Sequence, residues 1–172
     1  MDLIVVANGK TGGCEARWGD RLMRAAMGPA GPASAKREGD GTSPVGRFPL
    51  RYLMYRPDRL RPVPTGLAQR PLAPADGWCD DPADVLYNRP VRLPYPARHE
   101  RLWRDDEVYD LIVVLGHNDD PVVPGAGSAV FLHVARADFS PTSGCIVLSR
   151  EDLLAVLASA GPGDCLVVGP SA

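Results

Sequence analysis

The sequence predicts a single domain spanning residues 1–172 that is built mostly from β-strands. Glycine and proline, with 18 residues each, favour turns over long helices. The apolar residues gather in short runs between turn signals, a pattern typical of strands. We therefore expect a mostly-β fold in which helices are few and short.

The first part of the chain reads as a strand over Leu3–Ala7, followed by the tight-turn signal Asn8-Gly9. A return strand is expected over Gly13–Trp18. Apolar residues at 22, 23, 26 and 27 then fit a helical period and predict a short helix over Asp20–Met27. Gly28-Pro29 would end that helix.

A loop rich in small residues follows over Gly28–Ala35, and Gly39-Asp40-Gly41 predicts a turn. The next strand is expected over Arg47–Tyr55. Residues 56–108 form a long insertion in which recurring prolines prevent long regular elements. The insertion is too aromatic for a disordered segment, so we expect an ordered cover that forms one wall of a cleft. Its aromatic residues include Trp78, Tyr87, Tyr95 and Trp103.

Apolar strands are expected over Tyr109–Leu115, Ala129–Val134 and Cys145–Leu148. Ser149 begins a helix from about Arg150 to Ser159, with Asp152 at the third helical position as in a capping box. Gly161-Pro162-Gly163 ends this helix, and Cys165–Val168 is the last strand expected.

The most informative motif is Ser143-Gly144-Cys145, which lies twelve residues after a histidine in an apolar strand, His133. A thiolate is a strong nucleophile, and a neighbouring imidazole can create it at neutral pH. We therefore predict Cys145 as the nucleophile and His133 as the general base. The second ring nitrogen of His133 is expected to donate to a backbone carbonyl, which would fix the tautomer.

These residues resemble the YkuD family of L,D-transpeptidases, in which a histidine precedes a Ser/Thr-x-Gly-Cys motif. A second stretch, from Lys36 to Phe48, is similar to the family's K-x-x-G-D-x-x-T-P-x-G-x-F run. The resemblance covers roughly residues 36 to 168. It implies a β-sandwich with one short helix near the C-terminus, interrupted here by the Pro-rich insertion. It also implies an oxyanion hole made by the backbone N–H groups of Ser143, Gly144 and Cys145.

The chain departs from the family pattern at two positions. Ser143 stands where many members carry a second histidine, with Thr142 on the Ser/Thr site, and Val147 stands where many carry Arg or Asn. The nucleophile and base therefore carry over more readily than the substrate contacts.

The substrate-binding residues that we predict are His117, Asn118, Arg136 and Thr142. His117 and Asn118 are placed at the cleft edge, contacting the peptide carboxylate, where His117 could fill the space of the absent second histidine. Arg136 could clamp a substrate carboxylate with its guanidinium. In the second stretch, Gly46 is expected to shape a turn, and the side chains are expected mainly to brace the cleft: Lys36, Asp40 and Thr42.

The charge and the spacing of the cysteines exclude several classes of partner and ligand. The net charge of −2 carries no basic stripe, so neither nucleic acid nor anionic lipid is a predicted partner. No stretch is long and apolar enough for a membrane span. The cysteines lack CxxC spacing, and a site formed by Cys145, His133 and His117 has no known metal-ligand spacing. We therefore expect no metal, no cofactor and no structural disulfide.

The resemblance implies two-step acyl transfer on peptidoglycan stem peptides or muropeptides. Water as the acceptor would give an L,D-carboxypeptidase, and a second stem would give a transpeptidase that forms 3–3 cross-links. The start of the sequence lacks a signal-peptide pattern, so we expect a cytoplasmic location and the carboxypeptidase activity of muropeptide recycling. A periplasmic location would follow if a signal peptide had been removed. A muropeptide-binding module without catalysis is the alternative from a different class.

Overall fold

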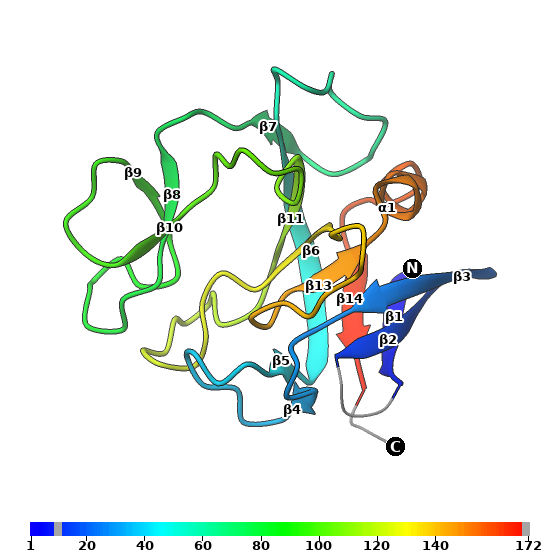
Figure 1. Cartoon of the computed structure of the whole chain (residues 1–172), viewed down its shortest axis with the longest axis horizontal. Coiled ribbons are helices and arrows are strands. Elements are labelled where there is room, and N and C mark those ends of the chain that lie inside the picture. Colours follow the sequence, from blue (N-terminus) through cyan, green and yellow to red (C-terminus); the bar gives the residue numbers. More distant parts are fainter. Residues whose placement is uncertain (9–11, 170–172) are drawn as a thin grey trace.

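The computed structural model describes residues 1–8 and 12–169, and its strands far outnumber its single described helix (Figure 1). The mostly-β prediction is confirmed. The elements in chain order are β1 (Asp2–Ala7), β2 (Gly13–Trp18), β3 (Arg21–Ala26), β4 (Pro32–Ala33), β5 (Ser43–Pro44), β6 (Gly46–Tyr55), β7 (Gln69–Pro71), β8 (Asp76–Cys79), β9 (Pro90–Arg92), β10 (His99–Arg101), β11 (Leu111–Leu115), β12 (Phe131–Val134), β13 (Ile146–Leu148), α1 (Arg150–Leu157) and β14 (Cys165–Val168).

The main sheet folds back on itself because its longest strand, β6, pairs with β11 in addition to its neighbours β14 and β7. The strand order is β11-β12-β13-β3-β2-β1-β14-β6-β7, and β6 also pairs with β11. The start of β6, residues 46–49, pairs with β14, whereas residues 50–55 pair with β11. The two sides of the folded sheet thus enclose one apolar core, consistent with the expected sandwich-like fold.

Strands β11 and β12 are buried on both faces, and alternate residues serve two different clusters. Leu111 and Val113 point into the main core, whereas Ile112 and Val114 join a second cluster outside the folded sheet. On β12, Leu132 likewise faces the main core. The outer face of these two strands therefore needs an apolar cover.

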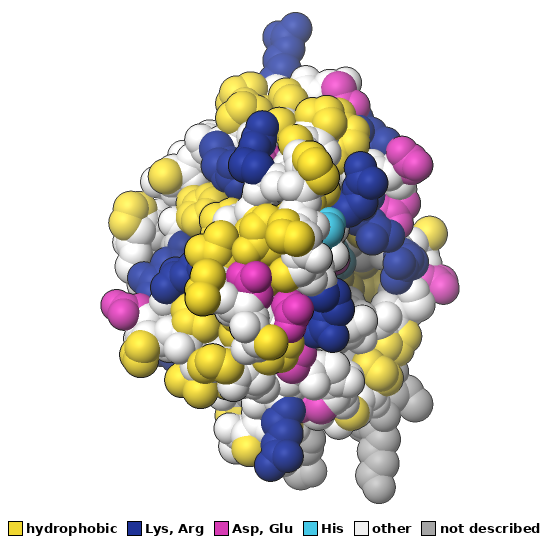
Figure 2. All heavy atoms as spheres, turned by 90° about the vertical axis from the view of Figure 1, so that its left-hand side faces the viewer, with side chains coloured by type: hydrophobic (Ala, Val, Ile, Leu, Met, Phe, Trp, Pro, Cys, Tyr) yellow, Lys and Arg dark blue, Asp and Glu magenta, His cyan; other side chains and the backbone are white. Residues whose placement is uncertain are grey.

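Residues 56–108 provide that cover, as the sequence predicts. Leu72, Trp78 and Leu102 pack in the second cluster, and the Trp78 ring meets the Phe131 ring edge-on at a centroid distance of 5.1 Å. The segment forms a small sheet of its own in the order β10-β8-β9, at the left of Figure 1. On this face of the molecule, acidic and basic side chains are interspersed (Figure 2).

The helix predicted over Asp20–Met27 is wrong, because that segment forms β3, which pairs antiparallel with β2. The apolar positions fit both periods, but the strand register buries Met23, Ala25 and Met27 on one side. Leu22, which a helix would have buried, is 69% exposed. Pairing with β2 thus overrides the local helical pattern.

The other predicted strands are present within a residue or two of their expected ends. Helix α1 ends two residues before the predicted boundary, and its cap is as expected: the backbone N–H of Asp152 donates to Ser149 Oγ over 3.0 Å. The predicted Asn8-Gly9 turn falls in part outside the described residues. Cys14, Cys79, Cys145 and Cys165 are all free thiols. Among the described residues, no helix has the length and apolar character needed to cross a bilayer.

A buried carboxylate ties the covering segment to the sheet. Asp110, just before β11, is 1% exposed and pairs with Arg59 over 2.8 Å and with Arg150 at the start of α1. Because each ion has an opposite partner, burial of this charge is compensated. The pairs fix where the cover leaves and rejoins the folded sheet.

Replacement of Leu102 by alanine should lower the free energy of unfolding by about 2–5 kcal/mol, because the side chain is fully buried in the second cluster. The matched control is Leu86→Ala in the same segment, where the side chain is 41% exposed and the loss should stay within about 0.5 kcal/mol. Urea unfolding followed by tryptophan fluorescence measures both. Equal effects of the two substitutions would contradict an ordered, packed cover.

Candidate active site

Cys145 lies at the end of a tight turn that a glycine makes possible. Gly144 has a φ of 139°, and a Cβ at this residue would lie 2.7 Å from the Thr42 carbonyl oxygen. Thr142 Oγ1 accepts from the Gly144 N–H over 3.1 Å and donates to the Cys145 carbonyl over 2.6 Å. From the opposite side, Ser43 Oγ donates to the Gly144 carbonyl over 2.8 Å. The turn is therefore fixed before any substrate binds.

These bonds revise the predicted oxyanion hole. The Gly144 N–H is already bonded to Thr142 Oγ1, so it is not free to receive an oxyanion in this conformation. The N–H groups of Ser143 and Cys145 remain the candidate donors. Thr142, predicted as a substrate contact, lines the pocket but uses its hydroxyl to shape the turn.

His133 is held on β12 with one ring nitrogen bonded to the backbone. Its Nδ1 lies 3.0 Å from the Val134 carbonyl oxygen. A carbonyl can only accept, so Nδ1 carries the proton and Nε2 can act as the base. This agrees with the tautomer that the sequence predicts. The ring also packs edge-on against Tyr109, with centroids 4.9 Å apart, which fixes its plane.

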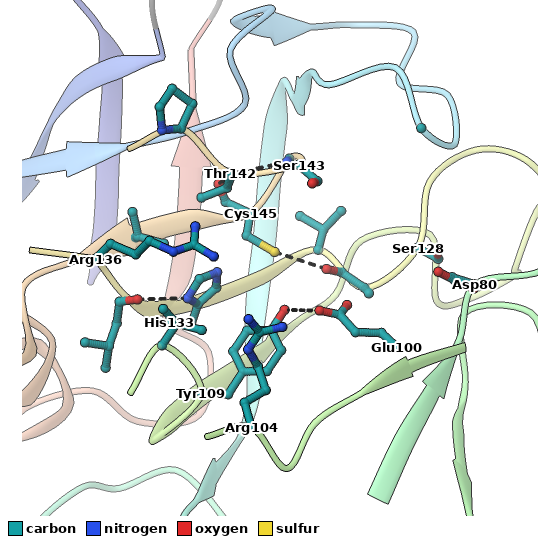
Figure 3. Close-up of a pocket in the computed structure, with 18 of the residues that line it drawn as sticks. Asp80, Glu100, Arg104, Tyr109, Ser128, His133, Arg136, Thr142, Ser143 and Cys145 are labelled. Atoms are coloured by element: carbon teal, nitrogen blue, oxygen red, sulfur yellow. Dashed lines mark hydrogen bonds between the residues drawn. The ribbon is translucent and has the colours of Figure 1, made fainter. Parts of the chain in front are cut away.

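The thiol of Cys145 is hydrogen-bonded to the backbone and not to the imidazole of His133. It donates to the Ala129 carbonyl over 3.2 Å, and the Phe131 N–H donates to the sulfur over 3.4 Å. The dashed line from the Cys145 sulfur in Figure 3 marks the bond to the Ala129 carbonyl, and His133 lies on the other side of the Cys145 side chain. A rotation of the thiol away from Ala129 is therefore needed before His133 can take its proton.

Both groups are neutral in the empty pocket. Burial, reinforced by the negative charge of Glu100, raises the pKa of Cys145 to about 12. Burial also lowers the pKa of His133 from 6.5 to about 4. This differs from the expectation that the imidazole creates a thiolate at neutral pH, because the apolar surroundings disfavour the ion pair. Burial thus favours the neutral thiol and imidazole over the ion pair.

Cys145 and His133 open into the same pocket, a cavity of about 450 Å³. One wall comes from the turn and β12, and the other comes from the covering segment and Tyr109, as predicted for residues 56–108. Arg136 also lines this cavity, beside His133 (Figure 3). Whether its guanidinium clamps a carboxylate stays a prediction.

His117 and Asn118 do not line this pocket, in contrast to their predicted role. His117 packs edge-on against Phe48 at 5.4 Å, and its Nε2 lies 3.1 Å from the Ala126 carbonyl. The Asn118 side chain bonds to the backbone at Val123 and Gly127. Both residues brace their own loop, so His117 does not fill the place of a second catalytic histidine.

The bracing role expected for Lys36 and Asp40 agrees with the structure. Lys36 Nζ lies 2.6 Å from Asp40 Oδ1, which also accepts from the backbone N–H and hydroxyl of Thr42. Burial opposes ionisation of Asp40, but these hydrogen bonds prevail and hold its pKa well below the ordinary value. The network fixes the strip of backbone that lies under Gly144.

Sequence reasoning missed several pocket residues, among them Glu100, Arg104 and Tyr109. The Tyr109 hydroxyl donates to Glu100 Oε1 over 2.5 Å, and the Arg104 guanidinium lies 5.5 Å from the centre of the Tyr109 ring. Glu100 and Arg104 come from the irregular segment, where no periodic pattern indicates which side chains turn inward. The only indication in the sequence was the expectation that residues 56–108 form one wall of the cleft.

The arrangement is suited to thiol acyl transfer, because a cysteine thiol, a histidine with a fixed tautomer and backbone N–H groups share one cavity. No cluster of metal-binding side chains occurs in the part of the chain that the structure describes. A comparison with known families matches residues 3–168 to YkuD, the L,D-transpeptidase catalytic domain. Searches of curated proteins and of solved structures gave no match.

The raised pKa of Cys145 predicts slow alkylation at neutral pH. The rate with iodoacetamide should rise about tenfold per pH unit between pH 7 and 10, because the thiolate fraction grows at that rate well below the pKa of about 12. Intact-mass spectrometry, with a Cys145→Ala variant to subtract the other cysteines, follows the reaction. A plateau below pH 9 would mean that the thiolate is already formed in the empty pocket.

Burial of neutral His133 should make the fold less stable in acid. The unfolded imidazole takes up a proton near pH 6.5, whereas the folded one does so only near pH 4. The unfolded state therefore binds more protons in between, and the stability present above pH 6.5 is lost as the pH falls through 4. This shift corresponds to about 3 kcal/mol.

The measurement is urea unfolding at pH 7 and pH 4 for the wild type and for His133→Gln. The wild type should lose about 3 kcal/mol more than the variant between the two pH values. Equal losses would show that His133 is already protonated in the fold or is not buried.

Proposed function

The chain belongs to the YkuD family of L,D-transpeptidase catalytic domains, and we propose that it releases the terminal D-Ala of peptidoglycan tetrapeptide stems through a thioester on Cys145. Family membership supports cysteine acyl transfer on peptidoglycan. The observation that carries the assignment of residues is that Cys145, on its glycine turn, and His133, with Nε2 available, line one cavity.

In the acylation step, the Cys145 thiol leaves Ala129 and gives its proton to His133 Nε2 as the sulfur attacks the carbonyl of the third stem residue. The oxyanion forms beside the N–H groups of Ser143 and Cys145. The C–N bond to D-Ala then breaks, and the His133 imidazolium returns the proton to the departing amine. The products are a thioester on Cys145 and free D-Ala.

Arg136 is proposed to hold the carboxylate of the departing D-Ala. The leaving amine must reach His133 to be protonated, so D-Ala occupies the His133 side of the thiol. Arg136 lies on that side (Figure 3), and a guanidinium binds a carboxylate through two parallel hydrogen bonds. This arrangement favours an unblocked C-terminal residue.

Water is proposed as the favoured acceptor of the acyl group, which makes the enzyme an L,D-carboxypeptidase. The cavity at Cys145 has the size of a site for one small ligand, and hydrolysis requires only a single stem to be bound. Soluble muropeptides would fit such a site, and their recycling would match a cytoplasmic location. The alternative is transfer to the amine of a second stem, which forms a 3–3 cross-link and would match the periplasm.

Incubation with a purified disaccharide-tetrapeptide should yield disaccharide-tripeptide and free D-Ala, with Cys145→Ala as the inactive control. Mass spectrometry identifies the products. Cross-linked dimers in place of tripeptide would assign the second stem as acceptor. The absence of any Cys145-dependent product would contradict the proposed function and leave peptide binding without catalysis.

A further inference from the structure

Near its end, the loop between β11 and β12 contains a non-glycine residue with a left-handed backbone. Ala129 has a φ of 50°, a conformation that a residue with a Cβ disfavours. Its carbonyl oxygen accepts the hydrogen bond from the Cys145 thiol, which is the dashed line from the sulfur in Figure 3. Such a backbone persists only where neighbouring groups hold it. The group that holds Ala129 therefore also decides where the thiol rests.

That group is the side chain of Asn88, which is buried in the covering segment. Its Oδ1 accepts from the Ala129 N–H over 3.1 Å, and no other side chain in the described part of the sequence bonds to that N–H. Its Nδ2 donates to the carbonyls of His117 and Asn118, at the start of the same loop, over 3.1 and 2.8 Å. One amide thus joins both ends of the loop that leads to Ala129.

The hydrogen bonds of the Asn88 amide allow only one orientation. Besides the Ala129 N–H, its Oδ1 accepts from the indole N–H of Trp78 over 2.9 Å. With the amide turned over, its NH2 group would face two N–H donors and its oxygen would face two carbonyls. Asn88 itself has a φ of 54°, which asparagine tolerates better than most residues. A buried amide with all its partners is a rigid support.

We propose that Asn88 is a positioning residue that holds the Cys145 thiol in its resting place by fixing the backbone of Ala129. The inference rests on the proposed function, in which Cys145 is the nucleophile, and deepens it by naming what restrains the thiol before a substrate binds. Asn88 does not line the pocket. It acts on the sulfur through one backbone carbonyl.

The Ala129 carbonyl favours the protonated form of the thiol. A carbonyl oxygen accepts a hydrogen bond from S–H but repels a thiolate, so this contact disfavours ionisation of the sulfur. The effect adds to burial, which raises the pKa of Cys145. Without Asn88, Ala129 would relax out of the left-handed region and its carbonyl would turn from the sulfur. The thiol would then ionise more readily.

Asn88 has a simpler structural role, because its four hydrogen bonds brace the loop. Loss of a brace alone would loosen the loop and expose the sulfur. The two roles differ when Ala129 is replaced by glycine, which adopts a positive φ without the cost of a Cβ. This substitution removes the reason for the backbone to relax, whereas it would loosen an unbraced loop further.

The test is the rate at which iodoacetamide alkylates Cys145, which requires no peptide. Peptide mapping by mass spectrometry counts adducts on Cys145 alone. Asn88→Gly, which permits the positive φ of residue 88, should react about tenfold faster than the wild type at pH 8. This corresponds to a fall of about one unit in the pKa of the thiol. Ala129→Gly alone should react like the wild type. Added to Asn88→Gly, it should bring the rate back toward that of the wild type.

The matched control is Asn118→Gly, which loosens the same loop without touching Ala129. Asn118 also has a positive φ, 48°, and its side chain forms three hydrogen bonds to the backbone of Val123 and Gly127. Their loss leaves Asn88 on the Ala129 N–H, so the alkylation rate should stay near that of the wild type. Circular dichroism verifies that each variant is folded.

An unchanged rate in folded Asn88→Gly would overturn the inference. So would an equal rise in Asn118→Gly, or a rate that does not fall when Ala129→Gly is added to Asn88→Gly. If Asn88→Gly does not fold, a crystal structure of the wild type without substrate decides. The sulfur must lie on the Ala129 carbonyl and Asn88 on the Ala129 N–H, and any other arrangement overturns the inference.

These results are independent of the test of the proposed function, which is the release of D-Ala by the wild type. If no D-Ala is released while the alkylation rates behave as expected, the proposed function fails and the role of Asn88 stands. If D-Ala is released while Asn88→Gly leaves the alkylation rate unchanged, only the role of Asn88 fails.

Discussion

Strands β11 and β12 are apolar on both faces, and the rest of the structure depends on how their outer face is covered. The inner face completes the core of the folded sheet, where burial needs no further element. The outer face, with Ile112 and Phe131, would lie in water without a cover. Residues 56–108 supply that cover, and the pocket is the space that remains where the cover meets β12 and the turn before β13. The site therefore forms at the edge of the covering segment that β11 and β12 need to bury their outer face.

The same burial determines the chemistry of the site. Low polarity around Cys145 and His133 holds both in their neutral forms, so the protein does not keep a reactive thiolate exposed in the absence of substrate. A neutral pair can react only when the developing charges are met by something in the pocket. In the proposed mechanism, backbone N–H groups meet the oxyanion, and the imidazolium exists only between attack and departure of the amine.

Local patterns were sufficient to predict the parts of the site that are close in sequence. The glycine turn before Cys145, the strand carrying His133 and the cap at Ser149 all follow from short motifs whose geometry is set by neighbouring residues. Period alone could not separate helix from strand over residues 20–27, because the deciding contact is the distant pairing with β2. Glu100 could not be predicted either, because it reaches the pocket through tertiary packing of residues 56–108, which no local pattern specifies.

His117 is the opposite case, a residue predicted for the site that does not line the pocket. A polar residue at a strand end is a reasonable site residue, yet its ring is used to pack against Phe48 and to hold a loop. What decides between the two uses is the direction of the side chain, which the sequence does not specify once the strand has ended.

The two walls of the pocket come from different parts of the fold. The reacting groups, Cys145 and His133, come from the sheet and the turn, whereas Glu100 and Arg104 come from the cover. Elements of the sheet are fixed on both sides by pairing, and their side chains keep one geometry. The cover is held to the sheet by the β6–β7 pairing, the Arg59–Asp110 ion pair and apolar packing, so polar side chains outside these contacts can change as long as residues such as Trp78 and Leu102 stay buried. Substitutions in the cover can therefore alter which peptide is bound while the acyl-transfer machinery remains intact.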